Sequence, residues 1–88
     1  MFRMTADSDG KTTTIHLMGR IRAEHLDALR KITQAETGAI QLDLVEVTLV
    51  DVETVRFFCV CEAAGVRLAN CPAYIREWMM REREETLC

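Results

Sequence analysis

Long apolar runs are absent from this sequence of 88 residues. A membrane-spanning helix needs about 20 mostly apolar residues, and charged residues interrupt every apolar stretch here well before that length. The opening segment MFRMTADSDG also lacks the apolar block of a secretory signal. We therefore expect a cytoplasmic protein that does not use a membrane as a partner.

Basic residues are too few and too scattered to form a nucleic-acid surface. The chain carries 11 Lys and Arg against 14 Asp and Glu, which gives a formal net charge of -3. Phosphate binding needs a basic stripe or patch, and none is visible along the sequence. Nucleic acid is therefore not an expected partner.

Metal-binding spacings are missing as well. No Cys-x-x-Cys pair is present, and His16 and His25 lie far upstream of the cysteines, so we expect no zinc site and no other metal. We also expect no cofactor, since the sequence has no glycine-rich phosphate loop. Cys71 precedes Pro72 at an expected helix start, a setting that can favour a thiolate, but a buried thiol is the favoured interpretation.

The residues that are present match a single globular domain. Apolar residues make up 49% of the chain and charged residues 28%, the balance of an ordinary folded protein. A chain of this length supports one hydrophobic core. We expect one domain over residues 1–88, without linker or repeat.

Residue periodicity predicts alternating strands and helices. The expected strands cover residues 1–6, 12–18, 39–51 and 66–70. The expected helices cover residues 23–37 and 52–65, each closed by a glycine, and a final segment that begins at Pro72. An Asp-Gly turn implies an antiparallel opening hairpin, and the strand-helix-strand crossovers imply parallel pairs. The expected fold class is α/β, with a mixed four-stranded sheet and about three helices.

Three segments of the chain resemble the STAS domain, a family named for sulfate transporters and anti-sigma factor antagonists. HLMGRI is similar to the end of that family's second strand, and IQLDLVEVTLVD to its central strand and following loop. VRLANCPAYIREW is similar to its last strand, turn and final helix. The three segments occur in the family's order and together extend over nearly the whole chain. The resemblance implies a bacterial signalling protein with a STAS-like fold.

The resemblance places a regulatory site at the start of the helix after the central strand. Regulatory members of the family carry Asp-Ser-Ser-Gly-Leu there, and a partner kinase phosphorylates the second serine. Asp51 matches the aspartate, but Glu53 stands where the phosphorylated serine would be. The resemblance therefore implies a divergent, non-enzymatic module that is not switched by serine phosphorylation.

Glu53 has two interpretations. It could stand in for a phosphoserine, although phosphoserine carries a charge of about -1.5 to -2 and a carboxylate only one. The favoured alternative is that Asp51 caps the helix while Glu53 complements the positive end of the helix dipole. Thr54 is similarly more typical of a first helical turn than of a displaced phosphoacceptor.

The expected partner contacts lie at this helix start. They are Asp51, Glu53, Thr54, Arg56 and Phe57. The implied partner is a kinase-like anti-sigma factor or a scaffold component, and no residue is assigned a catalytic role. The alternative function is binding of a small apolar ligand or lipid, which a closed apolar cavity between helix and sheet would favour.

The same helix has two apolar stripes. Val52, Val55 and Cys59 form one, and Phe57, Val60, Cys61 and Ala64 form the other. Either neighbouring helices cover the second stripe or it is an interaction surface. A weak homodimer through Phe57, or through Tyr74 and Trp78, is a further expectation.

Overall fold

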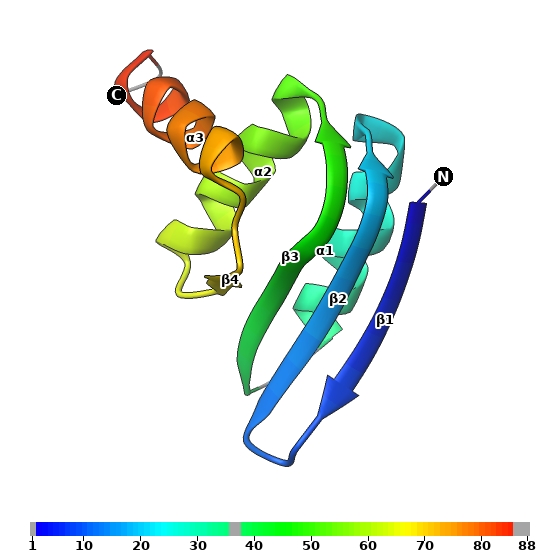
Figure 1. Cartoon of the computed structure of the whole chain (residues 1–88). Helices are drawn as coiled ribbons and strands as arrows, with labels where there is room; N and C mark the ends of the chain where they lie inside the picture. The colour runs from blue at the N-terminus through cyan, green and yellow to red at the C-terminus, as the bar shows by residue number, and fades with distance from the viewer. Residues whose placement is uncertain (1, 36–37, 86–88) are drawn as a thin grey trace.

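The computed structural model describes residues 2–35 and 38–85, and Figure 1 shows them in the predicted order. The strands are β1 (Phe2–Ser8), β2 (Thr12–Ile21), β3 (Ala39–Val50) and β4 (Arg67–Ala69). The helices are the short 3-10 turn η1 (Ala23–His25), followed by α1 (Leu26–Ala35), α2 (Val52–Ala63) and α3 (Ala73–Glu85). The predicted α/β class, with a mixed four-stranded sheet and three α-helices in the described ranges, is confirmed.

The sheet has the order β1-β2-β3-β4. The first pair is antiparallel, while β2 with β3 and β3 with β4 are parallel. The predicted opening turn is built around Asp9, whose carboxylate accepts the amides of Lys11 at 2.9 Å and Thr12 at 2.7 Å. Gly10 supplies the positive φ of 94° that this turn requires.

Several element bounds differ from the sequence prediction, among them the end of β1, which reaches Ser8 instead of residue 6. β2 continues to Ile21 instead of ending at Met18, because the register shifts around Gly19, which has a φ of 86°. The bulge returns Ile21 to the buried side, where it is 0% exposed. The first turn of the predicted 23–37 helix is η1 rather than α-helix. The predicted ends at Met1, Thr37 and Cys88 lie outside the described residues.

One face of the sheet carries the core. Ile15, Leu17, Leu42 and Leu44 are at most 1% exposed, and Val55 and Phe58 of α2 join the same cluster. α1 lies behind the sheet in Figure 1 and contributes the buried Leu26 and Leu29. In the middle of β2 and β3 the alternate residues are polar and half-buried, as the period of two along a strand requires; they are Thr14, His16, Gln41 and Asp43.

α2 ends as the sequence predicted, at a glycine. The amide of Gly65 donates to the carbonyl of Glu62 at 3.1 Å, and that of Val66 to the carbonyl of Cys61 at 2.9 Å. Gly65 has a φ of 99°, so the pair of bonds forms a Schellman motif. β4 follows at once and pairs only with Gln41–Asp43 of β3.

α3 covers one of the two apolar stripes of α2. Ile75 and Met79 of α3 are 0% and 1% exposed, and the Cys59 thiol lies 3.6 Å from the Met79 carbonyl oxygen. The second stripe is covered only in part, because Phe57 is 7% exposed whereas Val60 is 67% exposed. Among the described helices, none is both long and apolar enough to cross a membrane.

Candidate functional site

Asp51 joins the start of α2 to the loop after β2. Its backbone is extended (φ -103°, ψ 176°), and its Oδ1 accepts the amide of Thr54 at 2.9 Å. The other oxygen, Oδ2, accepts the amide of Ala23 at 2.9 Å. Partial burial opposes ionisation, but the hydrogen bonds from Thr54 and Ala23 outweigh it and lower the pKa of the carboxyl. The carboxylate of Asp51 is therefore used inside the fold.

Thr54 is a buried part of the same arrangement. Its side chain is 0% exposed, and its hydroxyl oxygen lies 2.7 Å from Asp51 Oδ1 and 3.2 Å from the carbonyl oxygen of Ile21. A partner or a kinase could not reach this hydroxyl without opening the helix start. Thr54 is therefore not part of the exposed surface at this helix start.

Glu53 and Arg56 lie on the outer side of the same turn. Their side chains are 56% and 51% exposed, and Arg56 Nη1 lies 3.5 Å from Glu53 Oε1. Arg56 Nε also donates to Oε1 of Glu82 on α3 at 2.9 Å, and Glu82 is 8% exposed. The negative charge of Glu53 is thus paired with Arg56 of the same chain. This pairing favours a role in stabilising the helix start over recognition of the charge by a partner.

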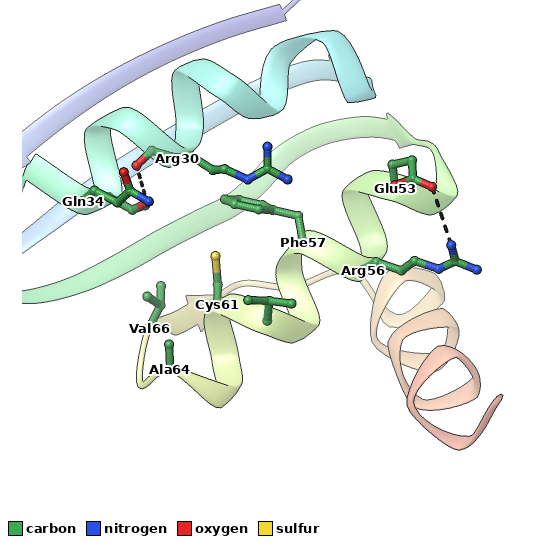
Figure 2. A pocket seen from close by; sticks show the side chains of 10 residues that line it. Arg30, Gln34, Glu53, Arg56, Phe57, Cys61, Ala64 and Val66 are labelled. Carbon is green, nitrogen blue, oxygen red and sulfur yellow. Dashed lines mark hydrogen bonds and ion pairs between the residues drawn. The ribbon is translucent and has the colours of Figure 1, made fainter. Parts of the chain in front are cut away.

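A groove of about 480 Å³ runs between α1 and α2 (Figure 2). Phe57, Cys61, Ala64 and Val66 supply its apolar lining, and Val60 stands at its rim. Figure 2 shows Arg30 of α1 extending toward the Phe57 ring, with Cζ 5.8 Å from the ring centroid. The guanidinium and the ring are close enough for a cation–π contact.

The groove is open to solvent, because charged side chains more than half exposed stand on both rims. Arg30 is on the α1 rim, and Glu53 and Arg56 are on the α2 rim. It is therefore not the closed apolar cavity that would favour a buried small ligand. An apolar floor with charged rims is typical of a surface that binds another protein.

Comparison with known families now identifies the chain. The sequence model of the family described as "Mlab, STAS domain" matches residues 4–79. The chain belongs to the STAS domain family. The resemblance drawn from three sequence segments is thereby confirmed. No relative among curated proteins matches the chain.

The structure of this STAS domain separates the five predicted contact residues into two groups. Asp51 and Thr54 face inward and hold the helix start together, and Phe57 is a buried residue in the groove lining. Only Glu53 and Arg56 of the five are more than half exposed. Sequence reasoning missed Arg30, because nothing in the local pattern of α1 indicates that α2 packs beside it.

Two cysteines of the STAS domain, Cys61 and Cys71, lie where burial disfavours the thiolate. Burial raises the pKa of Cys61 to about 11. Burial likewise raises the pKa of Cys71, although the nearby Arg76 acts in the opposite direction. Both shifts favour the thiol form, so the interpretation of Cys71 as a structural residue is the one these shifts support. Within residues 2–35 and 38–85, no group of three or more potential metal ligands gathers.

A second polar cluster lies on the open face of the sheet. His16 Nδ1 is 3.1 Å from Asp43 Oδ2, while Asp43 Oδ1 accepts the Val45 amide at 3.1 Å and Asn70 Nδ2 at 3.2 Å. Partial burial opposes ionisation of Asp43, but these hydrogen bonds outweigh it and lower its pKa. The cluster ties β2, β3 and the turn after β4 together, which gives it a structural role.

Proposed function

We propose that this STAS domain is a non-enzymatic regulatory or scaffolding module that binds a protein partner through the groove between α1 and α2. The observation that carries the proposal is the groove itself, with an apolar floor around Phe57 and charged rims at Arg30 and Arg56. Aromatic and arginine side chains are enriched at protein interfaces. A kinase-like anti-sigma factor or a scaffold component is the proposed partner class, by analogy with regulatory members of the family.

Val60 supports this proposal, because a partner that buries its exposed side chain would gain binding free energy. It is an apolar side chain 67% exposed at the edge of an apolar groove. Covering such a side chain releases roughly 1 to 2 kcal/mol. Aspartate at this position would place a charge in the interface and weaken binding without disturbing the core.

The test compares two matched variants. Val60→Asp and Val45→Asp both introduce a carboxylate at an exposed valine, but Val45, 62% exposed, lies on β3 and outside the groove lining. Proteins captured by the wild type and by Val45→Asp, but lost with Val60→Asp, would be purified and titrated by calorimetry. We expect Val60→Asp to weaken that binding at least about tenfold. Equal affinity of the two variants would contradict the proposal.

We further propose that serine phosphorylation does not switch this module. Position 53 carries no hydroxyl, and the hydroxyl of Thr54 is buried and bound to Asp51. Incubation with a serine kinase of the family's partner class should leave the chain unmodified, whereas Glu53→Ser restores an exposed hydroxyl and provides the positive control. Phosphate found on Thr54 of the wild-type chain by mass spectrometry would overturn this part of the proposal.

A small apolar ligand is the second candidate, since a volume of about 480 Å³ is within the range of ligand pockets. The exposed rims make it the weaker candidate. A fluorescent fatty-acid probe that binds the wild type but not Val60→Asp, together with failure of the protein capture, would favour this alternative.

A further inference from the structure

Two arginines stand together at the end of β2, away from the groove. Arg20 and Arg22 flank Ile21, which is 0% exposed, and both arginines are exposed. The backbone of Arg22 is still extended, with φ -123° and ψ 169°. Because residues two apart on an extended chain point to the same side, both guanidinium groups emerge on the side opposite Ile21.

The two arginines line two adjoining hollows at this end of the sheet. One, of about 250 Å³, also includes Phe2, Glu24 and His25. The other, of about 360 Å³, includes Leu49, Val50 and Asp51. Arg20 and Arg22 belong to both, so they form the wall between the hollows. Neither hollow shares a lining residue with the α1–α2 groove.

Both side chains differ from most other arginines of the chain in lacking an ion-pair partner among the described residues. By contrast, ion pairs engage five other arginines, which are Arg30, Arg56, Arg76, Arg81 and Arg83. Asp51, which lines the larger hollow with both arginines, already accepts hydrogen bonds from Thr54 and Ala23.

Each hollow also contains an apolar side chain beside the arginine pair. Leu49 is 52% exposed in the larger hollow. In the smaller one, the rings of Phe2 and His25 stack with centroids 4.3 Å apart and an interplanar angle of 12°. His25 Nδ1 accepts the backbone amide of Arg22 at 3.0 Å, which holds the ring in place. The surface therefore combines two guanidinium groups that form no ion pair with the described residues, the exposed Leu49 side chain and the stacked rings of Phe2 and His25.

We propose that Arg20, Arg22 and Leu49 form a second interaction surface, which binds an acidic segment of a protein partner that carries an apolar side chain beside its carboxylates. A guanidinium matches a carboxylate with two parallel hydrogen bonds, and Leu49 offers an apolar contact next to them. This inference goes beyond the groove and does not depend on it.

The surrounding charge favours a protein segment over a membrane or a nucleic acid. The chain has a net charge of -3, and Glu24 and Asp51 lie in the same two hollows. Binding to a phosphate-rich surface relies on an extended positive field, which two arginines among acids do not provide. A short segment with locally placed carboxylates needs only the two guanidinium groups.

The test measures fluorescence anisotropy of a labelled peptide with alternating Glu and Leu, titrated with the intact domain at low and high salt. We expect Arg20→Gln with Arg22→Gln to weaken binding about tenfold or more, and Leu49→Ser to weaken it a few-fold. The charge-matched control is Lys31→Gln with Arg67→Gln, two exposed bases outside both hollows. This control and Val60→Asp should bind the peptide like the wild type.

Several outcomes would overturn this second surface. One is that the Arg20 and Arg22 double variant and its control weaken peptide binding equally. Another is that a peptide with Lys in place of Glu binds as tightly as the acidic peptide. A third is that the wild type shows no binding up to about 1 mM peptide. Arginine-dependent binding of phosphatidylglycerol vesicles or single-stranded DNA, without binding of the acidic peptide, would overturn the choice of a protein segment. Because Val60→Asp is silent here, failure of this surface and failure of the groove proposal are distinguishable.

Discussion

The inner and outer sides of the first turn of α2 use acidic residues in opposite ways. Asp51 accepts hydrogen bonds from Thr54 and Ala23 and is half-buried, whereas Glu53 is 56% exposed and forms an exposed ion pair with Arg56. The two acids are two positions apart in the sequence. The difference shows that one helix start can separate a structural acid from a surface acid, and our proposal therefore assigns partner binding to the groove rather than to the acids.

Acidification should produce the largest effect, because it acts at once on several carboxylates that accept hydrogen bonds within the fold. The pKa values of Asp9, Asp43, Asp51 and Glu62 are all lowered in the folded protein. A lowered folded pKa contributes stability above the unfolded value near 4, and that stability is lost as the pH falls through the folded pKa. Urea unfolding should therefore show a clear loss of stability from about pH 5 downward.

Asp51→Asn sharpens this first prediction. Asparagine keeps an acceptor for the Thr54 amide but cannot lose a negative charge, so the variant should show a smaller loss between neutral pH and about pH 3 than the wild type. Identical pH profiles for the two proteins would contradict the account of the Asp51 carboxylate.

Asp51→Ala should give the next largest effect. It removes the acceptor of the Thr54 amide and hydroxyl and of the Ala23 amide. We expect a loss of about 2 kcal/mol in the free energy of unfolding, at the upper end for a helix cap, because two backbone amides and a hydroxyl all lose the Asp51 carboxylate as an acceptor. Chemical denaturation measures this loss. A loss below about 0.5 kcal/mol would show that the Asp51 cap contributes little to stability.

Thr54→Val tests the buried hydroxyl of the inner side. Valine keeps the shape of threonine but leaves the carbonyl of Ile21 and one site on Asp51 without the hydroxyl. We expect a loss of about 1 kcal/mol. The control is Thr33→Val on α1, where the hydroxyl contacts only the carbonyls of its own helix. A smaller loss at Thr54 than at Thr33 would argue against the inner network.

Arg56→Met should have the smallest effect on stability. It removes the hydrogen bond to Glu82, whose side chain is 11% exposed, while keeping most of the apolar stem. The expected loss is about 0.5 kcal/mol, because Arg56 itself is half exposed and solvent screens the pair. Glu53→Gln, which removes only the exposed pair, should cost still less. A larger loss for Glu53→Gln would reverse the distinction between the two sides of the turn.

Sequence pattern was sufficient for the elements that depend on neighbouring residues. The cap at Asp51, the turn at Asp9 and the end of α2 at Gly65 all rest on bonds within a few positions. Periodicity alone ended β2 at Met18, because Gly19 breaks the alternation, and the sheet partner shows how Ile21 returns to the core. The resemblance of HLMGRI to the end of the family's second strand had already included Ile21.

The site was less accessible to sequence reasoning, because its contacts join distant segments. The burial of Thr54 depends on the carbonyl of Ile21, 33 positions away, and the partner of Arg56 on α3 is 26 positions away. The contact between Arg30 and Phe57 likewise joins two different helices. No local pattern contains these pairings. The sequence predicted five contact residues, whereas in the structure only two of the five are more than half exposed, and the groove between α1 and α2 was not predicted.

Calorimetric titration of the purified partner against three forms of the domain tests the central claim most directly. The forms are the wild type, Glu53→Gln and Val60→Asp, each shown to have the same unfolding free energy within about 0.5 kcal/mol. Our account predicts that Val60→Asp binds at least about tenfold more weakly, while Glu53→Gln stays within about twofold of the wild type. Loss of binding in Glu53→Gln, with Val60→Asp unaffected, would contradict it and make the charge of Glu53 the feature that the partner recognises.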